Sequence, residues 1–121
     1  MIVNKDFIPY QESLELKQLG FDEECLDVYN KYGILWGMRI QNQPIVDNAC
    51  FAPLYQQAFR WFREKYNLPS TIMHRVSIDD GGICYDWLIL GQDVKYRHFD
   101  TYEDAELACL SKLISIVKEK Q

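Results

Sequence analysis

The chain has 121 residues, of which 48% are hydrophobic and 26% charged, a balance typical of a globular protein of one compact domain. This composition excludes a collagen-like chain, a disulfide-rich scaffold and an intrinsically disordered chain. The 13 basic and 18 acidic residues give a net charge of −5, which disfavours binding to a phosphate backbone.

The first predicted element is a short helix from Pro9 to about Leu19. Proline is tolerated in the first turn of a helix, because its missing N–H would be unpaired there. Gly20 suits a left-handed ending, and Phe21 is then expected to pack back on Leu16.

A β-hairpin is expected after this helix. Two extended runs, Leu26–Tyr29 and Ile34–Ile40, flank a turn-forming segment. Residues 41–52 are predicted to form a loop, with a little strand at residues 45–46.

Pro53 opens a second predicted helix that runs to about Tyr66 and is amphipathic. At 100° per residue its apolar side chains fall on one arc, opposite Arg60 and Arg63. The arc comprises Leu54, Tyr55, Ala58, Phe59, Trp61, Phe62 and Tyr66. Packing on a sheet accounts for most of the arc, and a protein interface is the alternative for its widest part.

Three strands are expected next, at about Thr71–Ile78, Ile83–Leu90 and Val94–Phe99. Asp79-Asp80-Gly81-Gly82 is a turn between the first two. The central strand is apolar on both sides apart from Asp86, which predicts that both of its sides are covered.

The last predicted helix starts after Thr101 and reaches the C-terminal lysines. Thr101 is a good N-cap, and Asp104 lies three residues further on, close to a capping-box pattern. Apolar residues cover more than half of this helix, which predicts heavy burial or a partner subunit.

These elements predict an α+β fold built on an antiparallel sheet of at least three strands, with two helices on one face. Residues 53–121 form the helix–strand–strand–strand–helix core, and residues 1–52 form a helix and hairpin extension. We expect residues 1–121 to fold as a single domain.

The order of elements in residues 53–121 resembles the double-stranded-RNA-binding domain. Asn67-Leu68-Pro69 is similar to the exit of that family's first helix, and Thr101 and Ala105 match its last-helix signature. The three signature lysines fall on Tyr102, Glu103 and Glu106, and the family's Pro-His pair is replaced by Asp79-Asp80-Gly81-Gly82. The resemblance implies the fold and argues against binding to double-stranded RNA.

A second resemblance covers most of the chain and is to small proteins encoded by phages and prophages of Bacteroidetes. It is carried by Phe7-Ile8-Pro9-Tyr10, Leu19-Gly20-Phe21-Asp22-Glu23, residues 52–63, Tyr102-Glu103 and residues 105–110. This resemblance implies an origin and assigns no catalytic residue.

The sequence favours a non-enzymatic protein. Cys84 with His74 or His98 is a candidate nucleophilic pair, but no strained nucleophile motif accompanies these residues. The cysteines lack close metal-ligand spacing, the acidic clusters lack the pattern of a calcium loop, and no Gly-rich phosphate loop is present. We therefore expect neither a catalytic site, nor a metal, nor a cofactor.

Protein–protein interaction is the leading functional hypothesis, with a second copy of the chain among the expected partners. The candidate contact residues are Tyr55, Phe59, Arg60 and Arg63. Tryptophan, tyrosine and arginine are the residues most common at interface hot spots. The first alternative is nucleic-acid binding by a basic patch of Arg60, Arg63, Arg75, Lys95 and Arg97. A further alternative is an acidic decoy that competes with nucleic acid for a protein.

The sequence predicts a cytoplasmic protein that does not enter a membrane. Its first ten residues contain no apolar segment typical of a secretory signal. Its longest apolar runs are much shorter than the roughly 20 residues that a transmembrane helix needs.

Overall fold

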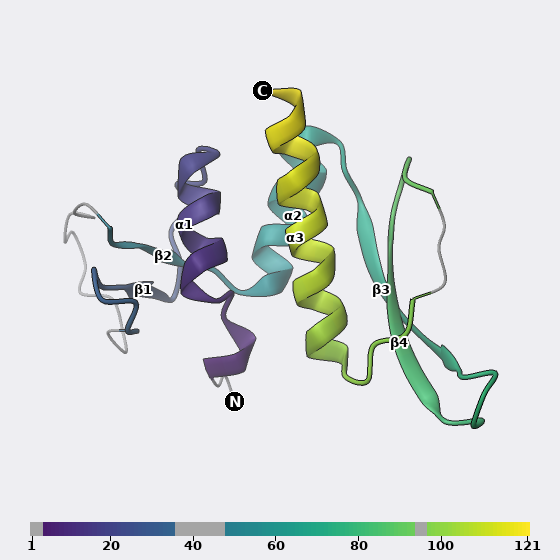
Figure 1. Cartoon of the computed structure of the whole chain (residues 1–121). Coiled ribbons are helices and arrows are strands. Elements are labelled where there is room, and N and C mark those ends of the chain that lie inside the picture. Colours follow the sequence, from purple (N-terminus) through teal and green to yellow (C-terminus); the bar gives the residue numbers. More distant parts are fainter. Residues whose placement is uncertain (1–3, 36–47, 94–96) are drawn as a thin grey trace. The chain divides into compact units, whose positions relative to one another are not determined.

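The structure is a computed structural model that describes residues 4–35, 48–93 and 97–121 (Figure 1). The described part is α+β, with three α-helices, one 3-10 helix and two antiparallel two-stranded sheets. The chain divides into two compact units, Met1–Gln57 and Ala58–Gln121, so the second predicted helix runs from one unit into the other.

The first unit contains the 3-10 helix η1 (Asn4–Asp6), helix α1 (Tyr10–Gln18), and strands β1 (Asp27–Tyr29) and β2 (Cys50–Ala52). Pro9 is the N-cap of α1, so the helix begins one residue later than predicted. Gly20 has a φ of 103°, and the N–H of Phe21 donates to the carbonyl of Leu16 at 3.0 Å. This is the expected glycine-dependent ending of the helix.

The predicted hairpin is seen only at its turn in the described residues, and its first strand also pairs with a strand distant in sequence. β1 pairs antiparallel with β2, so residues 50–52, predicted to be loop, form a strand. Of the second predicted run only Ile34 and Leu35 are described, and Leu35 makes an isolated bridge to Tyr29. Residues 36–40 and the expected strand at 45–46 lie outside the described residues.

Polar side chains of this unit bond to backbone carbonyls. The carbonyl of Ile8 accepts hydrogen bonds from Ser13 Oγ at 3.1 Å and from the Tyr29 hydroxyl at 2.7 Å. Lys17 Nζ donates to the carbonyl of Ala49 at 2.8 Å. These bonds connect α1 and the segment before it to the sheet around Tyr29, Cys50 and Ala52, the buried core of the unit.

The second unit follows the predicted order more closely. Helix α2 (Tyr55–Tyr66) ends at Asn67, whose φ of 55° turns the chain out of the helix. Strand β3 (Ser70–Val76) pairs antiparallel with β4 (Ile83–Ile89) over their whole length. Helix α3 (Tyr102–Lys120) begins with Thr101, whose side chain accepts a hydrogen bond from the N–H of Asp104 at 3.1 Å.

Helix α3 packs against the β3–β4 hairpin, as Figure 1 shows. The rings of Tyr102 and Tyr85 meet edge to face, with centroids 6.0 Å apart. The apolar side of α3 is buried, as its pattern predicts; its buried residues are Ala105, Cys109, Leu110, Leu113, Ile114, Ile116 and Val117. That α2 covers the same face of the sheet stays a prediction.

The third predicted strand of this sheet is reduced to a single bridge in the described residues. Residues 94–96 lie outside them, and within 97–99 only Phe99 pairs with β4. Tyr85 and Phe99 exchange two backbone hydrogen bonds, at 2.9 and 3.0 Å. The described sheet therefore has two full strands and a short third contact at the β4 edge.

Candidate interaction surfaces

The predicted contact residues on α2 differ in their accessibility. Tyr55 is 6% exposed and Phe59 is half-buried, whereas Arg60 and Arg63 are exposed. Arg60 Nε lies 3.8 Å from Glu64 Oε1, an exposed pair one helical turn apart. Because most aromatic side chains of α2 are buried, the aromatic arc serves the core, and Tyr55 offers little surface to a partner.

The predicted basic patch is not assembled among the described residues. Arg75 and Arg97 keep only 27% and 24% of their side chains exposed, and both point at Asp86. Lys95 lies outside the described residues. Arg60 and Arg63 are on a helix, whereas the other two arginines are engaged at the sheet, so phosphate binding would have to break ion pairs.

Asp86 is a fully buried carboxylate in the middle of β4. Its Oδ1 accepts hydrogen bonds from the N–H of Trp87 at 2.7 Å and from Arg97 Nε at 2.9 Å. Its Oδ2 accepts from the N–H of Arg97 at 2.9 Å and lies 3.6 Å from Arg75 Nη2. Such dense pairing is what a desolvated carboxylate requires, because a buried charge without partners costs several kcal/mol.

Arg97 completes this cluster from the neighbouring segment. Its Nη2 donates to the carbonyl of Trp87 at 2.8 Å, and its guanidinium stacks on the Trp87 ring, 3.6 Å from the centroid. Arg75 Nη2 donates to the carbonyl of Arg97 at 2.6 Å. Side chains thus occupy the N–H and C=O of Trp87 where a longer third strand would have supplied backbone partners. The cluster closes the outer edge of β4.

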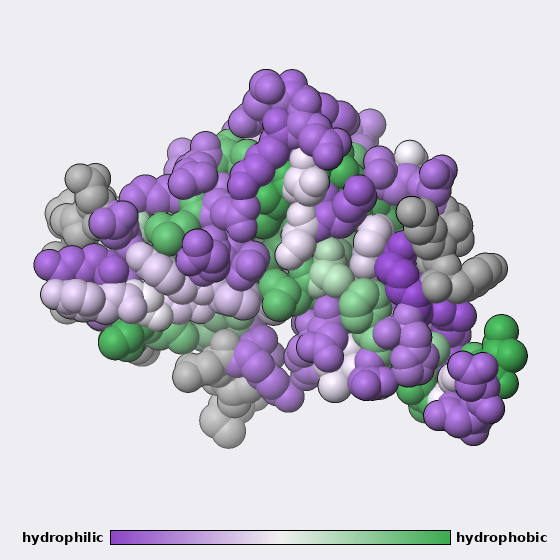
Figure 2. All heavy atoms as spheres, viewed as in Figure 1, coloured by the Kyte–Doolittle hydropathy of each residue, from purple (hydrophilic) through white to green (hydrophobic). Residues whose placement is uncertain are grey.

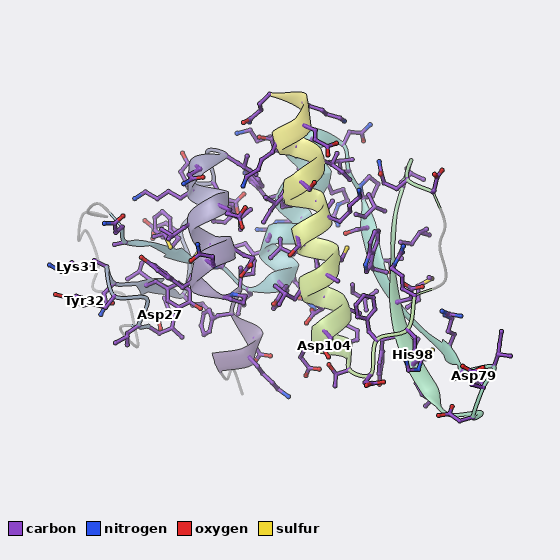
Figure 3. All side chains as sticks on the ribbon, in the orientation of Figure 1. Asp27, Lys31, Tyr32, Asp79, His98 and Asp104 are labelled. Carbon is purple, nitrogen blue, oxygen red and sulfur yellow. The ribbon has the colours of Figure 1, made fainter. Side chains whose placement is uncertain are left out.

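The candidate nucleophile and bases are not arranged for catalysis. Cys84 is buried in β4, and His74 lies opposite Tyr85, one residue away in register. Neighbouring positions of a strand pair point to opposite faces, so Cys84 and His74 are on different sides of the sheet. His98 is exposed beside the hairpin, with Nδ1 3.6 Å from Asp100 Oδ1 (Figure 3).

The thiols of Cys25, Cys50 and Cys109 have raised pKa values. The pKa is raised to about 12 for Cys25, to about 11 for Cys50 and to about 12 for Cys109, in each case chiefly by desolvation. A reactive cysteine needs a lowered pKa, since the thiolate is the nucleophile. These three cysteines therefore behave as small apolar side chains.

The end of the β3–β4 hairpin presents apolar side chains to solvent. Val76 and Ile83 face each other across the strands and are 66% and 65% exposed, and Ile78 in the turn is 95% exposed. Figure 2 shows hydrophobic surface over this end of the hairpin, at the lower right. Asp79 projects from the same turn (Figure 3). We call Val76, Ile78, Asp79, Asp80 and Ile83 the hairpin tip.

The hairpin tip is held by a hydrogen-bonded turn. The N–H of Ser77 donates to Gly82 at 2.6 Å, and the N–H of Gly81 donates back to Ser77 at 3.1 Å. The Asp80 carboxylate accepts from the N–H of Gly82 at 2.9 Å, a bond that lowers the pKa of Asp80. Gly81 has a φ of 72°, a conformation that glycine adopts readily. The tip is thus a preorganised surface.

Two shallow hollows are lined by described residues. One, of about 280 Å³, lies in the first unit between the end of α1 and β2, and its walls include Lys17, Phe21 and Cys50. The other, of about 250 Å³, lies at the open end of the hairpin and is lined by Pro69, Ser70, Thr71, Leu88 and Leu90. The second hollow is at the opposite end of the hairpin from the tip.

Sequence reasoning did not find the hairpin tip or the pairing of Asp86 with Arg97. The signal for Asp86 was its position as the one charged residue in an otherwise apolar strand, which calls for a buried counter-ion. The signal for the tip was the placement of Ile78 and Ile83 on either side of an acidic turn.

The described residues contain no group of three or more histidine, cysteine, aspartate or glutamate side chains that could hold a metal ion. Within the same part of the chain, no helix is both long and apolar enough to span a membrane. No protein-family model matches the chain, and no curated protein or solved structure is detectably similar to it.

Proposed function

We propose that this chain is a non-enzymatic accessory protein that acts by binding another protein through the hairpin tip. The observation that carries this proposal is the exposure of Val76, Ile78 and Ile83 on a turn held by its own hydrogen bonds. Apolar side chains gathered on a rigid exposed turn are unfavourable in water and become buried when a partner binds.

The surroundings of the tip indicate the chemistry of the partner. Asp79 and Asp80 directly follow Ile78, and a lowered pKa keeps Asp80 ionised over a wider range of pH. A partner that offers an apolar recess would cover Ile78, while the two carboxylates stay in water at the rim of the contact. Because the turn is preorganised, binding would cost little conformational entropy on this side.

As scaffold we propose a diverged double-stranded-RNA-binding-domain topology in the second unit, and as origin a phage or prophage. The order α2, β3, β4, the Phe99 contact and α3 supports the first proposal. The sequence resemblance supports the second. On this scaffold the last helix starts with Tyr102, Glu103 and Glu106 where phosphate-binding lysines would lie, which favours protein over RNA as the partner.

Nucleic-acid binding remains the alternative proposal, and it now depends on Arg60 and Arg63. These are exposed, but Arg60 already lies near Glu64. A cytoplasmic location is part of both proposals.

The proposal is tested by capturing the tagged full chain, with and without nuclease, from a host lysate that also contains the untagged chain, using three forms of the protein. These are the unmodified chain, a tip variant carrying Ile78→Ser and Ile83→Ser, and a helix variant carrying Arg60→Ala and Arg63→Ala. We expect a protein that survives nuclease, is retained by the helix variant and is lost from the tip variant.

Capture that disappears with nuclease, or that is lost only in the helix variant, would support nucleic-acid binding instead. Because every substituted residue is exposed, all three forms should unfold within about 1 kcal/mol of each other. A melting curve for each form checks this.

A further inference from the structure

The two edges of the β3–β4 hairpin differ in their hydrogen bonding. The N–H of Leu90 donates to the carbonyl of Pro69, and the N–H of Ser77 donates to the carbonyl of Gly82. These two bonds show which residues of β3 form hydrogen-bonded pairs with β4. Odd-numbered residues of β3 therefore bond to β4, and the backbone groups of Ile72, His74 and Val76 point to the other edge. Among the described residues no strand or bridge lies on that side of β3.

Strand β3 lacks the commonest features that protect an open edge. Its seven residues include no proline, no lysine and no bulge in the pairing with β4. Its one cation, Arg75, points toward Asp86 and the carbonyl of Arg97. An unprotected edge of this length is a template for another strand.

We propose that a second copy of this chain is the partner, and that two copies associate by antiparallel pairing of their β3 strands. The inference rests on the proposed protein-binding function and names its partner. Association through one shared edge gives a two-fold symmetric dimer, in which the same surface is used by both copies.

One register of the two β3 strands pairs all of their outward-facing backbone groups. With the two-fold axis at Met73, Ile72 lies opposite His74 of the second copy, and Ser70 lies opposite Val76. Each such pair exchanges both backbone hydrogen bonds, as in any bonded antiparallel pair. Thr71 then lies opposite Arg75, so no two like charges face each other.

The same register brings the hairpin tip of one copy to the hollow of the other. Beyond the Ser70–Val76 pair, the turn that carries Ile78 continues alongside residues 68 and 69 of the second copy. That is the end of the hairpin where Pro69, Thr71, Leu88 and Leu90 line a hollow of about 250 Å³. The chain thus has an apolar projection and an apolar recess at opposite ends of one open strand, an arrangement that fits a second copy.

The test compares two substitutions at one position by sedimentation velocity between micromolar and submillimolar concentrations. His74→Pro removes the outward N–H while leaving the ladder with β4 intact, because proline is tolerated on edge strands. His74→Ala keeps the N–H and is the matched control. We expect the unmodified chain and His74→Ala to form dimers, and His74→Pro to weaken dimerisation at least about tenfold.

A second measurement does not depend on the folding of a variant. In the unmodified chain, amide exchange of Ile72, His74 and Val76 should slow as the concentration rises, while Met73 stays protected at every concentration. A chain that is monomeric at submillimolar concentration overturns the inference, as does a dimer that His74→Pro leaves unchanged. In either case, capture that depends on the tip would still support the proposed function with a different partner, so the two proposals fail separately.

Discussion

The two edges of the β3–β4 hairpin use opposite solutions to the same problem. On β4, Phe99 supplies two backbone hydrogen bonds, and Asp86 with Arg97 then binds the N–H and C=O of Trp87. On β3, no strand or bridge of the described residues pairs with the outward groups of Ile72, His74 and Val76. At the closed edge the charged side chains bind each other and the backbone, which leaves them unavailable to a ligand. The open edge is unprotected. If the proposed pairing is right, stability depends on one side of the hairpin and recognition on the other.

The largest expected effect is the loss of the closed edge. Asp86→Ala should lower the free energy of unfolding by about 3–5 kcal/mol, because it leaves Arg75 and Arg97 partly buried without their shared carboxylate. Urea denaturation followed by circular dichroism measures the change. Asp79→Ala, which removes an exposed carboxylate from the tip, should stay within about 0.5 kcal/mol of the unmodified chain. If Asp86→Ala and Asp79→Ala lowered the free energy of unfolding equally, the pairing of Asp86 with its arginines would stabilise the fold no more than an exposed charge does.

Proline distinguishes the two edges directly. Phe99→Pro removes the N–H that donates to Tyr85 and should cost about 2–3 kcal/mol, whereas His74→Pro should cost less than about 1 kcal/mol. The measurement is thermal unfolding at a concentration low enough to keep copies apart. Phe99→Ala and His74→Ala are the controls. They measure how much of each loss in stability comes from removing the side chain rather than the N–H. A His74→Pro variant as unstable as Phe99→Pro would show that the β3 edge is bonded too.

A smaller effect is expected from Arg97→Lys. The charge remains, but the planar group that stacks on Trp87 and bonds to its carbonyl is lost, at a cost of about 1–2 kcal/mol. Tryptophan fluorescence should shift because the environment of the Trp87 ring changes. Arg63→Lys, on the exposed side of α2, is the control and should change neither quantity. If Arg97→Lys changed neither the stability nor the fluorescence, Arg97 would act only through its charge.

The smallest effect concerns the turn where the two edges meet. Gly81→Ala should cost about 1 kcal/mol, because a side chain at a φ of 72° is strained although nothing lies within 4 Å of the added carbon. Gly81→Asn should cost less, since asparagine adopts this conformation more readily. Equilibrium unfolding of both variants gives the two values. A cost for Asn equal to that for Ala would point to a cause other than backbone conformation.

The sequence predicted what depends on neighbouring residues. The start of α3 at Thr101, the ending of α1 at Gly20 and the hairpin around Asp79-Asp80-Gly81-Gly82 each follow from local backbone chemistry. The pairing of β1 with β2 joins segments more than 20 residues apart, and no local pattern encodes it.

The site was predicted less well for a related reason. Helical periodicity identified the apolar arc of α2 but could not distinguish core from interface, and burial places Tyr55 in the core. Likewise, Arg75 and Arg97 were assigned to a basic patch because their common counter-ion, Asp86, is recognisable only once the strands are paired.

The buried thiols have a practical chemical consequence. With pKa values of about 11 to 12, the thiols of Cys25, Cys50 and Cys109 are almost entirely un-ionised at pH 7. Cys84 is 1% exposed and is shielded from reagents by the fold itself. The native chain should therefore resist alkylation and oxidation. A cysteine introduced at position 78 would accept a maleimide dye far faster than the native thiols, so the hairpin tip can be labelled selectively without first removing them.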